Sequence, residues 1–193
     1  MGGCDIIAEG VGLPGVTLVK ADPVKGAIFR LGLMGYVSHT VPATVLGIAR
    51  RALDEAAKIA KEKMRGYGKR VHLARRGVFQ AFLGESDLQL RAARALMLEN
   101  GHRIVADAVR TGAVQPENEA EVRAAGCYTT RLAVRIVDET VRYIGGEAIR
   151  RSSRLEQTLR DVHTAATHFF VSDTSIESHA QFLLGIEGAD AMS

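Results

Sequence analysis

Long amphipathic segments joined by short links are the feature that most constrains the fold of this chain. In residues 45–64, apolar side chains recur every three or four positions, while Arg, Lys, Asp and Glu occupy the opposite face. This period is typical of a helix that buries one face and exposes the other. The two glycines of "RGYGKR" predict where this helix ends.

Two further segments, residues 77–110 and 117–144, carry an apolar stripe with the same period. The intervening "TGAVQPENE" breaks the pattern, and Pro116 suits the first turn of the following helix, where no backbone N–H is needed. Gly145 and Gly146 then predict a helix end.

A fourth helix is predicted to begin after Ser153. Ser153 and Glu156 have the S-x-x-E spacing of a capping box, in which the serine oxygen and the glutamate carboxylate each accept a hydrogen bond from a backbone N–H of the first turn. Thr174 and Glu177 repeat this spacing, so we expect the helix to kink or restart near residues 172–173. A later glycine predicts its end.

The four segments predict an all-α fold, an up-down four-helix bundle with a short β-like N-terminal extension. Short links between long amphipathic helices favour antiparallel neighbours, and the bundle is expected to occupy residues 31–185. Residues 1–30 contain the β-like runs "CDIIAE" and "VTLVKADP" and are expected to form a separate piece, and residues 186–193 are expected to form a flexible tail.

Composition argues against several classes of function. The formal net charge is +3, and Lys and Arg alternate with Asp and Glu, so the sequence predicts no nucleic-acid partner. No apolar run approaches the roughly 18 residues of a membrane span, and the N-terminus lacks a signal-peptide pattern, so we expect a cytoplasmic protein. Cys4 and Cys127 are too far apart in the sequence for a CxxC site. His163 and His168 would lie about 140° apart around a helix, which argues against a shared metal ion.

Three stretches of the sequence occur in an informative order and spacing: "LGIARRALDEAAKIAKEK", "FQAFLGESDLQLRAARALML" and "YIGGEAIRRSSRLEQTLRDVHTAATH". Together they resemble the C-terminal helical domain of the acyl-CoA dehydrogenase superfamily, in the type 2 form that is shared with two-component flavin-dependent monooxygenases. The resemblance implies that residues 1–30 are the last piece of a central β-domain. It also implies that FAD or FMN lies between that domain and the bundle, with a neighbouring subunit completing the site.

The resemblance implies two different chemistries, which the residues help to separate. An acyl-CoA dehydrogenase needs a carboxylate base, usually eight residues after the Asp of "RD", and that position here is Phe169. Another place for the base in the family is the start of the first bundle helix, but residues 35–45 contain no Asp or Glu. His168 precedes Phe169, at the spacing where monooxygenases of the family keep a histidine that faces the flavin and handles protons. We therefore expect a monooxygenase or hydroxylase that uses reduced flavin and O2 on an aromatic or other apolar substrate, with His168 as its catalytic residue.

Two alternatives stay open at this point. One is an acyl-CoA dehydrogenase whose base has been relocated. The other is a non-catalytic bundle that serves only oligomerisation, because a chain lacking most of the β-domain is expected to be inactive alone. The resemblance also implies a homodimer or homotetramer, a small-molecule substrate and, for a monooxygenase, a flavin reductase as partner.

The resemblance assigns cofactor contacts to Gly145, Gly146, Arg160, Arg76 and Phe79. The bare backbone of the glycine pair would let the flavin or its nucleotide tail approach closely. Arg160 would contact the flavin phosphate, and Arg76, just before Phe79, would replace the arginine that many dehydrogenases carry after the first bundle helix. From the residues alone, the glycine pair is also an ordinary helix end, and Arg160 and Asp161 are also an exposed pair on a helix.

Overall fold

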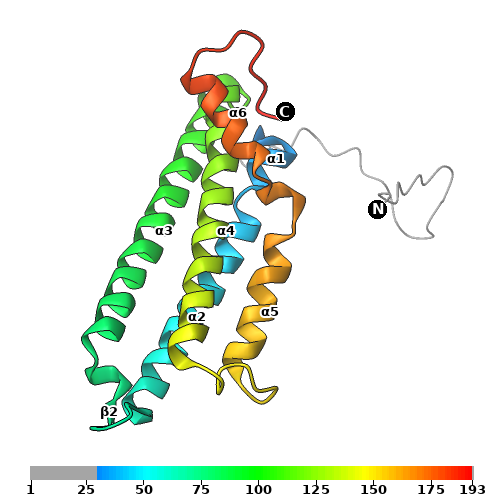
Figure 1. Ribbon diagram of the computed structural model, residues 1–193. Coiled ribbons are helices and arrows are strands. Elements are labelled where there is room, and N and C mark those ends of the chain that lie inside the picture. The colour runs from blue at the N-terminus through cyan, green and yellow to red at the C-terminus, as the bar shows by residue number, and fades with distance from the viewer. Residues whose placement is uncertain (1–29, 193) are drawn as a thin grey trace, which may run out of the picture.

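The computed structural model describes residues 30–192, and the β-like extension predicted for residues 1–30 lies almost wholly outside that range. Its long helices run up and down beside one another (Figure 1), which confirms the predicted all-α up-down bundle. The elements, in chain order, are α1 (Gly32–Val37), α2 (Thr40–Glu62), β1 (Met64–Arg65), β2 (Val71–His72), the 3-10 turn η2 (Leu73–Arg75), α3 (Gly77–Thr111), α4 (Pro116–Ile144), α5 (Arg154–Ala166), the 3-10 turn η3 (Phe169–Val171) and α6 (Thr174–Leu183).

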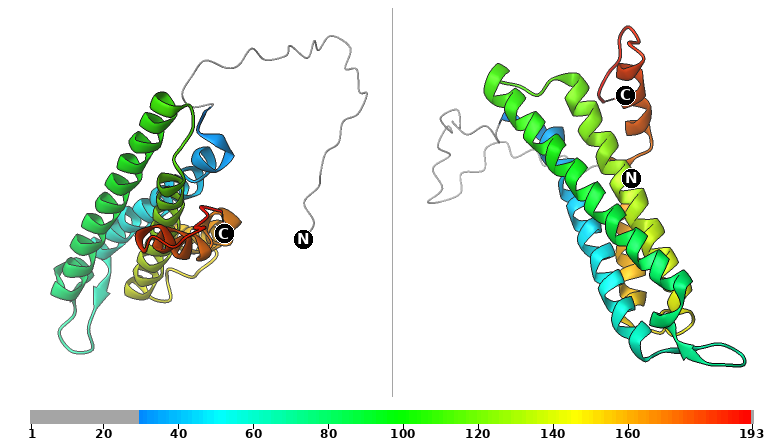
Figure 2. Two further views of the ribbon diagram at one scale, coloured as in Figure 1. Left: turned by 90° about the horizontal axis from the view of Figure 1, so that it is seen from above. Right: turned by 90° about the vertical axis from the view of Figure 1, so that its left-hand side faces the viewer.

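Helix α4 is the central element of the bundle, because it packs against α2, α3, α5 and α6. Figure 2 shows the same arrangement from two further directions. Side chains from these helices fill one continuous apolar core, and each fully buried large side chain contributes about 1.5–3 kcal/mol of transfer free energy. The largest of them are Phe79, Leu53, Ile136, Ile144 and Leu155. A second, smaller cluster contains Leu31, Ile104, Ala108 and Val122.

Small residues on α2 let it approach its neighbours closely. The buried positions Ala49, Ala52, Ala56 and Ala60 have no exposed surface, and they recur every three or four residues along the face that also carries the larger Val45 and Leu53. This is the apolar face predicted from the sequence, and methyl side chains at a helix contact favour the short end of the usual 8–10 Å axis separation.

Most predicted helix boundaries are confirmed, including the proline at the start of α4 and the end of α4 at Ile144. The capping box is confirmed only in its first half. The Ser153 oxygen accepts from the Leu155 N–H at 3.2 Å, but the Ser153 N–H donates to the carbonyl of Arg150 at 2.7 Å. The carboxylate of Glu156 therefore turns to Arg160 instead of closing the box.

The fourth position of the bundle is divided between α5 and α6, as the sequence predicted. Helix α5 ends at Ala166, and α6 begins at Thr174. The Asp173 carboxylate accepts from Arg131 of α4 at 2.5 Å and lies 3.6 Å from the Cys127 sulfur, which fixes the start of α6 to α4. The Arg131 bond lowers the pKa of Asp173.

A buried carboxylate organises the connection between α3 and α4. Asp107 accepts from the Asn118 side chain at 2.6 Å, from the Gln115 N–H at 3.3 Å and from Arg110 at 3.0 Å. Its side chain is only 7% exposed. The bond from Asn118 is the main cause that lowers the pKa of Asp107, so Asp107 is held as a carboxylate where the chain reverses.

Two small elements were not foreseen from the sequence. One is the short helix α1, which precedes α2. The other is an antiparallel hairpin between α2 and α3, in which Met64 pairs with His72 and Arg65 pairs with Val71. Among residues 30–192, no helix is both long and apolar enough to cross a membrane.

Candidate functional site

The β1–β2 hairpin and the glycine pair after α4 meet at one end of the bundle. Arg65 donates to the carbonyl of Ile144 at 2.7 Å, and Lys63 forms an ion pair with Glu147. Gly145 has a φ of +76°, and a Cβ atom placed on it would overlap the Arg65 guanidinium. A glycine is therefore required there by the backbone conformation and by the close approach of Arg65.

Three arginines line one hollow at this end of the bundle. The hollow has a volume of about 570 Å³, and no carboxylate lies in its wall. Guanidinium groups gathered at one hollow are suited to bind phosphate or carboxylate oxygens, although Glu147, which pairs with Lys63, also lies near Arg65 and its pKa is lowered by both. The lining residues are Met64, Arg65, Gly66, Tyr67, Arg70 and Arg76.

Of the residues predicted to bind cofactor, Gly145, Gly146 and Arg76 belong to this end of the bundle, and Gly145 lies directly against Arg65 of the hollow. Sequence reasoning missed Arg65 and Arg70. The only signal for them was the basic run "RGYGKR", which was interpreted as a helix end.

Phe79 lies in the core, although it was predicted to contact the flavin. Its side chain is 1% exposed, and its ring packs edge-on against Tyr143 at 5.8 Å and at a tilt against Phe82 at 6.2 Å. The Phe79 side chain therefore has no surface to offer a cofactor, and its first role is to hold α3 against α4.

His168 lies beyond α5, which corrects the expectation that it shares a helix with Arg160. It is exposed and immediately precedes the turn η3, where its Nδ1 atom accepts from the Phe170 N–H at 3.4 Å. In the neutral ring the proton therefore resides on Nε2. The imidazole stacks on Phe169 and Phe170 with centroid distances of 5.3 and 5.0 Å. Because Phe169 is 67% exposed, a titratable ring stands beside an exposed aromatic surface.

The polar groups of α5 form ion pairs within the chain. Arg160 donates to Glu156 at 2.7 and 3.1 Å, Asp161 accepts from Arg51 of α2 at 3.2 Å, and His163 lies 2.9 Å from Asp138 of α4. Both carboxylates of α5 are thus paired with arginines. Arg160 is exposed and belongs to an ion pair on the helix, as the simpler sequence interpretation predicted, but its partner is Glu156 and not the expected Asp161, which binds Arg51.

The structure separates the predicted residues into two groups. Gly145, Gly146 and Arg76 lie at the hairpin end of the bundle, whereas His168 follows the far end of α5. Helix α5 has 13 residues, so about 20 Å of helix separates the two groups at 1.5 Å per residue.

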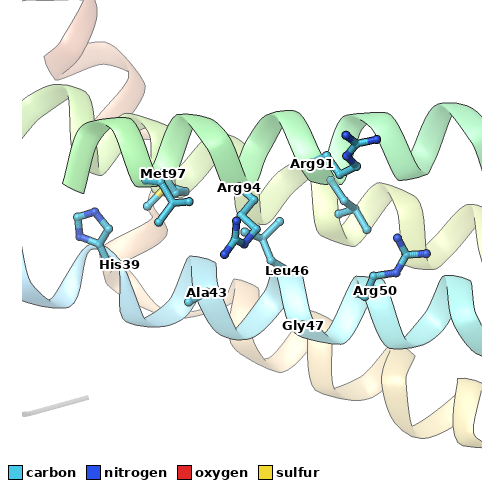
Figure 3. Close-up of a pocket in the computed structure, with 10 residues that line it drawn as sticks. His39, Ala43, Leu46, Gly47, Arg50, Arg91, Arg94 and Met97 are labelled. Atoms are coloured by element: carbon cyan, nitrogen blue, oxygen red, sulfur yellow. The ribbon is translucent and has the colours of Figure 1, made fainter. Parts of the chain in front are cut away.

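A third feature is a groove between α2 and α3 with a volume of about 690 Å³. Its floor is mainly apolar, and His39, Arg50, Arg91 and Arg94 stand along it (Figure 3). The Nδ1 atom of His39 is bonded to the carbonyl of Gly35 at 3.2 Å, and its buried Nε2 has no partner among the described residues. Sequence reasoning did not single out His39. Within residues 30–192, no group of three or more His, Cys, Asp or Glu side chains could hold a metal ion.

Comparisons with known proteins agree on one fold. Residues 39–173 match the family described as acyl-CoA dehydrogenase, C-terminal domain. A pigment production hydroxylase from a Rhodococcus species is 25% identical over 173 residues, covering 86% of this chain and 42% of the relative. An indole-3-acetate monooxygenase from Pseudomonas putida is 24% identical over 157 residues, covering 81% of this chain and 40% of the relative. The chain thus spans about two fifths of the length of these relatives.

Solved structures show the same arrangement of helices. XiaF from a Streptomyces species, in complex with FADH2 and glycerol, superposes with a TM-score of 0.77 at 19% identity, over 83% of this chain and 41% of that one. The 3-HSA hydroxylase from Rhodococcus sp. RHA1 gives a TM-score of 0.75 at 18% identity, over 87% of this chain and 44% of that one.

Proposed function

The chain belongs to the acyl-CoA dehydrogenase C-terminal domain family, and from this premise we propose that it is the helical domain of a flavin-dependent monooxygenase. In this proposal the enzyme uses reduced FAD or FMN and O2 to hydroxylate an aromatic or other apolar small molecule. The chain self-associates into a dimer or tetramer. A flavin reductase supplies the reduced cofactor from NADH, and this supply favours the cytoplasm as the compartment.

One observation carries the choice of chemistry: an exposed imidazole, His168, lies just beyond α5, one residue before the position where a dehydrogenase requires a carboxylate. Phe169 occupies the expected position of the base, and the two carboxylates of α5, Glu156 and Asp161, are held by Arg160 and Arg51. Neither carboxylate is free to face a substrate, because each already accepts hydrogen bonds from an arginine. The alternative of a dehydrogenase with a relocated base is therefore less well supported.

His168 is suited to proton transfer at a reacting oxygen. An imidazole whose Nε2 carries the proton can donate a hydrogen bond or that proton to a reacting oxygen. Its Nδ1 atom is held by the Phe170 N–H, which leaves Nε2 as the proton-carrying atom. The stacked rings of Phe169 and Phe170 supply an apolar wall for an aromatic substrate or for the flavin ring.

The hairpin end of the bundle is suited to the phosphate groups of a flavin. Arg65, Arg70 and Arg76 line one hollow, and Gly145 keeps the neighbouring backbone bare. When bound, the reduced flavin would supply the electrons that activate O2. Because this end lies roughly 20 Å along α5 from His168, we propose that the two regions contribute to flavin sites completed by other parts of the enzyme, including neighbouring copies.

The role of His168 is tested in the enzyme assembled with flavin, NADH and reductase. His168→Ala is expected to keep NADH consumption while product formation falls at least about tenfold and hydrogen peroxide is released. His163→Ala is the matched control, because His163 is also exposed and lies nearby, but it pairs with Asp138. Unchanged product yield per NADH in His168→Ala would exclude the proposed role. Reduction of a dye that depends on an acyl-CoA would instead support the dehydrogenase alternative.

The cofactor contact is tested by titrating the assembled enzyme with FAD and following flavin fluorescence. Arg70→Gln and Arg76→Gln are each expected to weaken binding several-fold, since each removes one charge-assisted bond to phosphate. Arg142→Gln, an exposed arginine of α4 outside the hollow, should leave binding unchanged. Equal effects of all three substitutions would show that the hollow is not the phosphate site.

A further inference from the structure

The turn η3 holds the ring of His168 through a short set of backbone hydrogen bonds. The Val171 N–H donates to the carbonyl of His168 at 3.0 Å. The Ser172 N–H donates to the carbonyl of Phe169 at 3.2 Å. Inside this turn, the Phe170 N–H donates to Nδ1 of His168 at 3.4 Å. The direction of one backbone N–H therefore decides which ring nitrogen is the acceptor and which one carries the proton.

One side chain of this turn is buried. Val171 is 7% exposed, whereas Phe169 is 67% exposed. The turn packs against α4, and Val171 lies in the wall of a hollow of about 510 Å³ that Thr130 and Val134 of α4 also line. A buried apolar side chain holds its segment on the surface that it covers, because returning it to water is unfavourable. Val171 thus supplies the apolar anchor of the turn.

A second anchor follows the turn. The Asp173 carboxylate accepts from Arg131 of α4 at 2.5 Å. Both side chains of this ion pair are exposed, at 54% for Arg131 and 72% for Asp173, and ion pairs that face water contribute little to stability. The buried valine is therefore the stronger of the two anchors.

We propose that Val171 is a positioning residue for His168, because it holds the turn in the form in which the Phe170 N–H meets Nδ1 and the ring proton stays on Nε2. This inference rests on the proposed role of His168 and names the side chain that secures it. If the Phe170 bond were lost, the proton could move to Nδ1, and Nε2 could then only accept a hydrogen bond. A ring that has to donate to a reacting oxygen would be in the wrong form.

The ring itself reports this role in the 193-residue chain, without any cofactor. In protein labelled with ¹⁵N-histidine, the chemical shifts of Nδ1 and Nε2, measured above the ordinary pKa of histidine, show which nitrogen carries the proton. His168→Gln identifies the signals of this ring. We expect the Nε2–H form to predominate in the parent chain and a mixture of both forms in Val171→Ala. Val171→Ile keeps a branched apolar side chain beside the hollow and should match the parent chain.

Val162→Ala is the matched control, because it makes the same truncation at a valine of α5 that has no exposed surface. It is expected to destabilise the fold through the cavity that it leaves and to keep the parent form of the ring. If Val171→Ala does not fold by circular dichroism, Val171→Thr replaces it, since it keeps the shape of the side chain and places a hydroxyl in the contact; a mixture is again expected. An unchanged ring in the folded variant, or an equal change in Val162→Ala, would overturn the inference.

Coupling in the assembled enzyme separates this inference from the proposed function. With flavin, NADH and reductase, Val171→Ala is expected to form several-fold less product per NADH and to release hydrogen peroxide, while Val171→Ile matches the parent enzyme. If His168→Ala uncouples the enzyme and Val171→Ala does not, the positioning role is excluded and the proposed function stands. If His168→Ala leaves coupling unchanged, the proposed function fails, and the ring signals still decide whether Val171 holds His168.

Discussion

Removal of the Asp107 carboxylate is the most informative test of how the two longest helices are joined. In Asp107→Ala, the Asn118 side chain, the Gln115 N–H and Arg110 all lose their acceptor. Hydrogen bonds to a charged group each contribute about 1.5–3 kcal/mol when both partners are buried. The Arg110 bond contributes little, because the Arg110 side chain is 68% exposed. The other two donors can partly rebind water, so we expect a loss of about 2–3 kcal/mol in the free energy of unfolding at pH 7.

The same carboxylate predicts a dependence on pH with a defined sign. The pKa of Asp107 is lowered in the folded chain, chiefly by the Asn118 bond, while an unfolded aspartate titrates near about 3.9. The folded state therefore binds the proton more weakly, and its extra stability is fully present above that value. It is lost as the pH falls through the lower folded pKa. The difference in unfolding free energy between the parent chain and Asp107→Asn should accordingly shrink between pH 5 and pH 2.

Urea unfolding followed by circular dichroism, at one fixed protein concentration, measures both effects. Asp54→Asn is the control, because Asp54 is 59% exposed and pairs only with Arg50 one turn earlier; we expect a change below about 0.5 kcal/mol. If Asp107→Ala lies within about 0.5 kcal/mol of the parent chain at pH 7, the Asp107 contacts do not fix the α3–α4 connection. A difference between the parent and Asp107→Asn that stays constant with pH would contradict the lowered pKa.

Two further predictions compare neighbouring residues in different environments. Gly145→Ala should lower the unfolding free energy by at least about 1–2 kcal/mol, because Gly145 has a positive φ and its Cβ would meet Arg65; Gly146→Ala meets nothing within 4 Å and should be nearly neutral. Phe79→Ala should lower it by about 3–5 kcal/mol through loss of a buried ring, whereas Val78→Ala, 61% exposed, should change it little. Urea unfolding measures all four variants, and similar values within either pair would contradict the packing described.

The helices could be predicted because their signals are local. The 3.6-residue period, Pro116 and the glycine pair set the bounds of α3 and α4 to within one or two residues. The division of the fourth helix was also visible, since Thr174 and Glu177 offered a second start. The sequence did not show that Glu156 leaves the capping box incomplete. That outcome depends on the turn before Ser153, where the carbonyl of Arg150 accepts the hydrogen bond from the Ser153 N–H.

The candidate site was only partly predictable, because its geometry comes from contacts between distant segments. Nothing in the run "RGYGKR" shows that Arg65 reaches the Ile144 carbonyl of another helix. Phe79 was assigned to the cofactor through its place in a family pattern, whereas its burial depends on Tyr143, far along the chain. His168 was singled out from the sequence as a candidate. The predicted helix, however, continued to residues 172–173, whereas α5 ends at Ala166 and leaves His168 outside the helix.

The division of the fourth helix has a consequence for local opening of the fold. Because η3 separates α5 from α6, the backbone hydrogen bonds of the two helices do not form one continuous ladder. Helix α6 is fixed to α4 at its start by Asp173 and Arg131, while α5 packs against both α2 and α4. Local opening follows such cooperative units, so amide hydrogens of α6 should exchange with solvent as one set, and those of α5 as another, more slowly. His168 lies at the junction, where opening of α6 would change the environment of its ring without unfolding the bundle.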